Sequence, residues 1–149
     1  MIAAALLCGC GTGAPASTSA WQSSSERVLG AAISGLGTAR IAVQQDVRGH
    51  VPHTYAVVAA TDAIDTSAKE VSGYLTDQPP DGLHRANRAV AQALQAALTL
   101  LADVRVELAS PGLQRSAADR LVSKIDAMTK RLDRLQTTAT SSPDSLGAG

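Results

Sequence analysis

The sequence predicts an all-α fold, an antiparallel up-down-up-down four-helix bundle, from its composition, its hydrophobic spacing and its breaks. Phenylalanine is absent, and aromatic residues make up only 2% of the 149 positions. Strands draw on aromatic and β-branched side chains, so this composition favours closely packed helices. Apolar residues recur every three or four positions in four segments, separated by short breaks rich in Gly or Pro. Short breaks force consecutive helices to run antiparallel.

The first helix is predicted at residues 19–47. Two capping boxes, Ser19 with Gln22 and Ser23 with Glu26, give two candidate starts one turn apart. Its apolar stripe consists of Leu29, Ala32, Leu36, Ala39, Val43 and Val47. Three glycines interrupt the segment and permit close helix approach: Gly30, Gly35 and Gly37. The alternative is a long three-helix bundle in which this segment breaks in two or packs as an outlier.

The second helix is predicted at residues 53–77. Gly49 supplies the C-cap of the preceding helix, and Pro52 suits the first turn of this one. Paired prolines in the break at 78–82 end it, because proline removes a backbone donor and restricts the residue before it. Its predicted stripe is Val57, Ala60, Ile64, Ala68, Val71 and Leu75.

The third and fourth helices are predicted at residues 83–109 and 110–136. The third has a seam suited to neighbours inclined near 20°, as in a coiled coil: Val90, Leu94, Ala97, Leu101, Val104 and Leu108. Ser110 and Pro111 suit the N-cap and first residue of the fourth. The stripe of the fourth is Leu113, Ala117, Leu121, Ile125, Met128, Leu132 and Leu135. The folded bundle should therefore span 19–136, and the polar residues 137–149 should form a disordered tail.

Both cysteines lie at the amino end, where an apolar run meets a small, polar stretch. Leu7, Gly9 and Cys10 carry the pattern Leu-x-Gly-Cys, which resembles the lipobox of a bacterial lipoprotein signal peptide. The resemblance implies a signal peptide at residues 1–9, cleavage after Gly9, and diacylglycerol on the Cys10 thiol with acylation, for instance by palmitate, of its new amino group. We expect the basic residues of such a signal to lie upstream of Met1.

The resemblance places the protein on the extracytoplasmic face of the cell membrane, held there by its lipid anchor. Residues 10–18 would then be the lipidated cysteine and a flexible tether that keeps the bundle about 15 Å from the anchor. The alternatives are a cytosolic protein with an apolar end, or a Cys8–Cys10 pair that binds metal or oxidises. A lone pair supplies only two of the four ligands that zinc usually takes, so we favour the lipid anchor.

Charge and hydropathy argue against nucleic-acid binding and against a membrane-spanning helix. Thirteen basic residues balance thirteen acidic residues, which leaves no global field to attract nucleic acid. The most apolar windows after the amino end are interrupted by Arg40 or by Gln92 and Gln95 and fall short of the roughly 20 apolar residues of a membrane span.

No constellation of residues predicts a catalytic, metal or cofactor site. His50 and His53 should lie at the opposite end of the bundle from His84, so the three histidines cannot share a metal. Asp62 and Asp65 could share a helix face as an acid and base pair, but a solvated face explains them equally. A di-iron bundle needs Glu-x-x-His pairs, and none of the glutamates has His three residues on: Glu26, Glu70 and Glu107. We therefore expect no enzyme, no metal and no cofactor.

Charge is segregated between the second and fourth helices, which a four-membered ring places diagonally. The second carries Asp62, Asp65, Glu70 and Asp77 against Lys69. The fourth offers a candidate interaction face: Arg115, Arg120, Lys124, Lys130, Arg131 and Arg134. The two faces could steer antiparallel self-association, or the basic face could lie on anionic headgroups. In the plainer interpretation both faces are solvated, with intrahelical pairs such as Asp126 to Lys130.

These features together predict a noncatalytic cell-envelope lipoprotein whose helical bundle is an interaction or scaffold module. Its partners would be the membrane, through the lipid anchor, and an envelope protein or a second copy. The alternative is a carrier that holds a lipid or another small apolar ligand between its helices.

Overall fold

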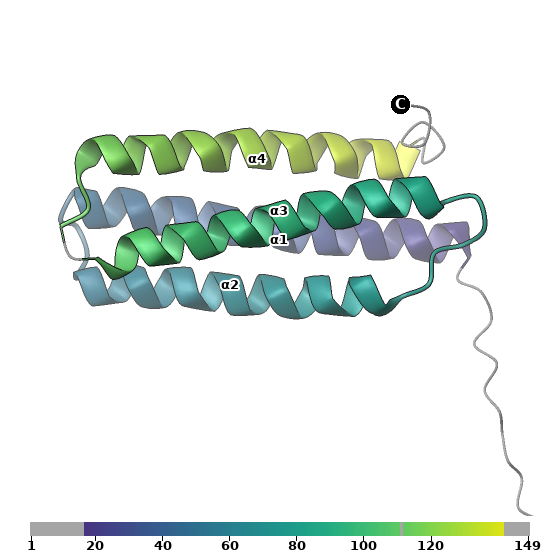
Figure 1. The fold of residues 1–149 in the computed structure, drawn as a ribbon, viewed down its shortest axis with the longest axis horizontal. Helices are drawn as coiled ribbons and strands as arrows, with labels where there is room; N and C mark the ends of the chain where they lie inside the picture. The colour runs from purple at the N-terminus through teal and green to yellow at the C-terminus, as the bar shows by residue number, and fades with distance from the viewer. Residues whose placement is uncertain (1–16, 111, 142–149) are drawn as a thin grey trace, which may run out of the picture.

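The computed structural model describes residues 17–110 and 112–141, which form four helices and contain no strand. The helices are α1 (Thr18–Val47), α2 (His53–Thr76), α3 (His84–Ala109) and α4 (Arg115–Ser141). They run alternately in opposite directions along one axis (Figure 1), which confirms the predicted four-helix bundle. α1 and α3 contact each other across the centre, and each also packs against α2 and α4. The predicted diagonal placement of α2 and α4 is therefore confirmed.

The first helix is continuous through its glycines, so the three-helix alternative is wrong. It begins at Thr18, within the predicted tether, because Ser17 is the N-cap and its Oγ accepts a hydrogen bond from the Ala20 amide at 3.1 Å. The capping boxes at Ser19 and Ser23 are not used, since both residues lie inside the helix. Gly49, with φ of 66°, turns the chain after α1 as predicted.

The fourth helix begins later than predicted. Ser110 is extended and ends α3, with its amide donating to the Glu107 carbonyl, and Pro111 lies outside the described residues. Gly112 has φ of 85°, a left-handed conformation that a continuous right-handed helix does not admit. α4 consequently starts at Arg115 rather than at 110.

The fourth helix also ends later than predicted, at Ser141 instead of Gln136. Hydroxyl groups in its last turns donate to carbonyls four residues back, for example Thr138 Oγ1 to the Arg134 oxygen at 2.8 Å. Ala139 is fully buried, and the side-chain Nε2 of Gln22 in α1 donates to its backbone carbonyl at 3.3 Å. Packing against α1 thus holds a polar sequence in the helix, and the predicted tail at 137–149 is wrong for 137–141. The remainder of that tail lies outside the described residues.

The core follows the predicted seams of α1 and α3. Every residue of the α3 seam is buried, as is every residue of the α1 stripe except the half-buried Val47. The largest side chains with almost no exposed surface are Leu29, Leu36, Leu94, Leu101, Leu108, Ile125 and Leu132. Alanines fill the spaces between them, which lets the helices pack closely.

The predicted stripe of α2 is displaced on the helix surface. Leu75 is 43% exposed, and Val57 and Ile64 are only half-buried. The buried face consists of Ala56, Ala60, Ala63, Ser67, Val71 and Tyr74. Small residues face inward because α2 approaches α1 at Gly35, where a larger side chain has no room.

Among the described helices, α3 alone is long and apolar enough to cross a membrane by length and composition. The expectation that the window with Gln92 and Gln95 falls short of a span is therefore wrong by this criterion. A core helix of a bundle has the same composition. Because α3 contributes its complete seam to the core and contacts the other three helices, we assign it to the bundle.

Candidate interaction surface

An open groove runs between α3 and α4 on the surface of the bundle. It contains two pockets, of about 350 Å³ and about 240 Å³, which both touch Arg131. The larger is lined by Leu100, Lys124, Ala127, Met128 and Arg131. The smaller is lined by Ala89, Gln92, Arg131, Arg134, Leu135 and Thr138. From Lys124 to Thr138 the groove follows α4 for about 21 Å, at ~1.5 Å per residue.

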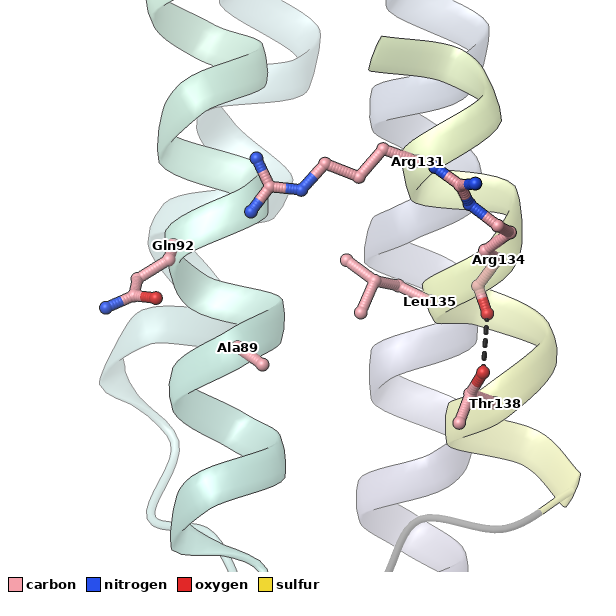
Figure 2. Close-up of a pocket in the computed structure, with 6 residues that line it drawn as sticks. All are labelled: Ala89, Gln92, Arg131, Arg134, Leu135 and Thr138. Carbon is pink, nitrogen blue, oxygen red and sulfur yellow. Dashed lines mark hydrogen bonds between the residues drawn. The ribbon is translucent and has the colours of Figure 1, made fainter. Parts of the chain in front are cut away.

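Figure 2 shows how the groove is built near the carboxyl end of α4. Leu135 points from α4 toward α3 and forms part of the floor, while Ala89 of α3 leaves space opposite it. The Arg131 side chain extends from α4 across the groove toward α3. Ala89 thus leaves room for a partner opposite Leu135, and the Arg131 side chain reaches over one end of that room.

The rim of the groove is cationic. Lys124, Arg131 and Arg134 are exposed, and none has an ion-pair partner among residues 17–110 and 112–141. No acidic residue lines either pocket. Because like charges lie above apolar surface with no counter-charge beside them, the groove suits a partner that is both anionic and apolar.

All six residues of the predicted basic face lie on α4 and are exposed. The groove brings together Lys124, Arg131 and Arg134. Arg115 instead lines a third pocket, of about 170 Å³, between the ends of α1 and α4, together with Asp119. Arg120 and Lys130 line none of these three pockets.

Asp126 of α4 does not form the intrahelical ion pair with Lys130 that its spacing suggests. Asp126 Oδ1 lies 2.9 Å from Arg40 Nε of α1, so this ion pair joins two helices. Lys130 has no ion-pair partner within the described part of the chain. Both side chains of the Arg40–Asp126 pair are more than 40% exposed, so solvent screens it and its contribution to stability is small.

The histidines are separated as the topology predicts. His50 Nδ1 lies 3.0 Å from Gln45 Oε1, and His53 Nδ1 lies 2.9 Å from Asp46 Oδ1, so both residues contact the end of α1. His84 begins α3 at the other end of the bundle. Within the described residues, no group of three or more His, Cys, Asp or Glu residues could hold a metal ion.

The predicted acid and base pair lies on an open surface. Asp62 and Asp65 are both exposed on α2 and line none of the three pockets. The side chain of neither residue forms an ion pair or a hydrogen bond with another described residue. Both carboxylates therefore lie on open surface, where they can meet a cation of another molecule.

Two further features were missed by the reasoning from sequence. The periodicity of α4 places Met128 and Leu135 on the core stripe; both pack against the core, but they are half-buried and also line the groove. A buried polar cluster lies near the start of α1: Trp21 Nε1 donates to Asn87 Oδ1 at 2.9 Å, and Ser25 Oγ lies 3.1 Å from Tyr74 Oη. The usable signal for the cluster was the Trp and Tyr residues themselves, since each carries a polar atom that needs a partner when buried.

Burial raises the pKa of the Tyr74 hydroxyl above its ordinary value of 10.0, because the phenolate loses solvation; the hydrogen bond to Ser25 opposes this shift. The hydroxyl is therefore protonated at neutral pH and acts as a structural hydrogen-bonding group of the core.

Comparison of the chain with known protein families, curated proteins and solved structures gave no match. The lipobox residues Leu7, Gly9 and Cys10 lie outside the described residues.

Proposed function

We propose that the protein is a noncatalytic interaction module of the bacterial cell envelope, tethered to the membrane through a lipid on Cys10. The observation that carries the interaction part is the α3–α4 groove, an apolar floor below three unpaired cations. The observation that carries the tether is the Leu-x-Gly-Cys pattern at residues 7–10. More than one acyl chain gives stable anchoring at roughly 0.8 kcal/mol per buried methylene.

The tether and the groove are compatible in their positions. The start of α1 and the end of α4 lie at the same end of the bundle (Figure 1), and the smaller groove pocket lies near that end. A lipid at Cys10 would therefore hold the Arg134 end of the groove nearer the membrane than the Arg115 end of α4. The far end of the bundle would extend into the envelope.

A second candidate function is a carrier of a lipid or another small apolar ligand. Its support is the larger groove pocket, whose lining is mostly apolar. The groove is open along its length, whereas carrier sites usually enclose most of their ligand. Native mass spectrometry of the purified protein should show a copurifying ligand if it is a carrier.

Lipidation is tested with an alkyne analogue of palmitate, fed to a bacterial host that makes the full chain from its natural start. The wild type and Cys8→Ser should be labelled, and Cys10→Ser should not. Cys8→Ser is the matched control, because it removes the other thiol of the same motif. Unlabelled wild type, or equal labelling of Cys10→Ser, would refute the anchor.

The interaction role is tested in the same host with a photo-crosslinking amino acid at Gln92, which lines the groove, or at Ser34, an exposed position on α1. We expect a discrete crosslinked product from position 92 and none from position 34. Absence of a product from position 92, or turnover of an envelope substrate by the purified protein, would count against a noncatalytic interaction module.

A further inference from the structure

The outer face of α2 carries an unpartnered stripe of apolar and acidic side chains. Tyr55 is 64% exposed and Val58 is 51% exposed. Asp62 and Asp65 continue the stripe toward the carboxyl end, followed by the exposed Lys69. The spacing of three and four residues places all five on one helix face. The apolar half of this stripe therefore precedes its acidic half.

The groove on α4 has the complementary order. Its first half, from Lys124 through Ala127 and Met128, is the more apolar pocket, and its second half carries Arg131 and Arg134. The two arginines are three residues apart, as are the two aspartates of α2. An acidic stripe on one copy can thus meet a basic stripe on another with both charges paired.

The register of this match fixes the relative direction of the two helices. When α2 runs parallel to α4 with Asp62 opposite Arg131, Asp65 falls opposite Arg134. Val58 then meets the apolar pocket at Ala127, and the Tyr55 ring falls beside the Lys124 ammonium, a favourable cation–π arrangement.

The antiparallel register is less favourable. With Asp65 opposite Arg131 and Asp62 opposite Arg134, Lys69 falls opposite Ala127 in the apolar pocket beside Lys124, and Val58 falls opposite Thr138 at the end of the groove. Burying an unpaired cation next to another cation costs free energy, so the parallel register is preferred.

We propose that this protein self-associates side by side through a heterologous contact. The α2 face of one copy (Tyr55, Val58, Asp62 and Asp65) docks in the α3–α4 groove of the next. Within one copy α2 and α4 run in the same direction at opposite corners of the bundle, so neighbouring copies share a common orientation. Such a heterologous contact leaves one free α2 face and one free groove, and it extends into a row unless the rotation closes it into a ring.

The parallel contact is compatible with the proposed membrane anchor. Copies anchored at Cys10 to one membrane would all point the same way, as the parallel register requires, and that part rests on the proposed lipid anchor. The contact itself does not depend on the anchor. Because its charged part is exposed at the rim, salt should weaken it.

The contact is tested by sedimentation velocity of the full chain carrying Cys8→Ser and Cys10→Ser, which prevents disulfide-linked species. We expect an average mass that rises with protein concentration at low salt. Asp62→Lys with Asp65→Lys, and Arg131→Glu with Arg134→Glu, should each weaken association roughly tenfold or more, because two attractive pairs become repulsive. The matched control, Arg115→Glu with Arg120→Glu, makes the same charge change outside the groove and should associate as the parent does.

The decisive measurement is the mixture of the two reversed variants, each first shown to be helical by circular dichroism. The reversed faces are complementary to each other, and so are the unchanged faces, so an equimolar mixture should regain association. A mixture that stays monomeric, or a parent that stays monomeric at all concentrations, overturns the proposal. Binding of a monomeric parent to phosphatidylglycerol vesicles, lost on Arg131→Glu with Arg134→Glu, would overturn it too, by assigning the groove to lipid.

This result is separable from the outcome for the proposed function. A groove crosslink at position 92 to a different protein would uphold the interaction module while the self-association fails. A failure of palmitate labelling would remove the membrane anchor and leave the sedimentation result unaffected.

Discussion

Gly35 of α1 lies directly against Ser67 of α2 in the interior of the bundle. A Cβ atom added at Gly35 would overlap Ser67 Oγ and would lie 3.3 Å from the Ala63 carbonyl oxygen and 3.6 Å from Leu101 Cδ1. Ser67 is 1% exposed, and its hydroxyl has no hydrogen-bond partner among the described residues. The close contact of the two helices thus requires the absence of a side chain at position 35.

Gly35→Ala should lower the free energy of unfolding by about 1–3 kcal/mol, because the new methyl group overpacks the interface with backbone on one side. Ser67→Ala in the same chain should recover part of this loss, because it removes the Oγ atom that the new methyl group meets. Urea unfolding followed by circular dichroism measures both effects.

Gly37→Ala is the matched control for that substitution. Gly37 lies in the same helix, and an added Cβ there meets nothing within 4 Å. In a helix interior alanine is better than glycine by roughly 0.5–1 kcal/mol, so this variant should be more stable than the wild type. Equal effects at positions 35 and 37 would show that helix propensity, rather than packing, determines the result.

The stability of the bundle should fall at alkaline pH because of Tyr74. Burial raises the pKa of this hydroxyl above 10.0, so the folded state holds the proton more tightly than the unfolded state. The resulting stabilisation is complete below about pH 10, the unfolded value, and is lost as pH rises through the folded pKa.

Tyr74→Phe supplies the comparison, since it has no proton to lose. Urea unfolding at pH 8 and pH 11 should show a larger fall in unfolding free energy for the wild type than for Tyr74→Phe. The variant should start from a lower value, because Ser25 loses its buried partner. Parallel falls in the two proteins would show that Tyr74 does not cause the alkaline loss.

Asn87→Ala should destabilise the bundle by about 1–3 kcal/mol, because the buried Trp21 Nε1–H loses its acceptor. The chain has one tryptophan, so the fluorescence of Trp21 reports unfolding directly. Gln92→Ala, an exposed substitution on the same helix, should change stability by less than about 0.5 kcal/mol. If the two variants unfold at the same urea concentration, the Trp21–Asn87 hydrogen bond contributes nothing measurable.

The seams of α1 and α3 could be predicted from spacing because Leu or Val occupies most of their positions, whereas apolar residues on the outer faces, such as Ile41 and Val106, form no competing stripe. On α2 two overlapping stripes compete: Val57, Ile64 and Leu75 belong only to the first and are large, whereas Ala56 and Ala63 belong only to the second and are small. Hydropathy favours the first stripe, but the buried one is the second, since the approach to α1 at Gly35 leaves little space. How closely α1 and α2 approach depends on both helices, so it cannot be read from the spacing of apolar residues within α2 alone.

The same reason explains the groove. The periodicity of α4 correctly places Met128 and Leu135 on the side that faces the core. Whether the α3–α4 interface closes over them depends on which side chains of α3 lie opposite. Ala89 and Gln92 occupy part of that surface and leave it open. The basic residues themselves were predicted, because exposure of arginine and lysine follows from their charge.

The end of α4 was mispredicted because residues 137–141 are mostly Thr and Ser, which are weak helix formers. Tertiary contacts outweigh that propensity. The side-chain Nε2 of Gln22 in α1 lies 3.3 Å from the backbone carbonyl oxygens of both Ala139 and Thr140. Gln136 Nε2 of α4 donates to the backbone carbonyl of Glu26 at 3.1 Å. α1 therefore holds the last turns of α4 in place.

A chain ending at Gln136 should consequently be less stable than a chain ending at Ser141, by about 1–2 kcal/mol. The shorter chain loses the buried Ala139 methyl group and leaves the Gln22 amide without its two acceptors. Thermal and urea unfolding of both truncated chains, compared with the full chain, measures the difference. Equal stability of the two truncated chains would mean that residues 137–141 only follow the helix and add nothing to the fold.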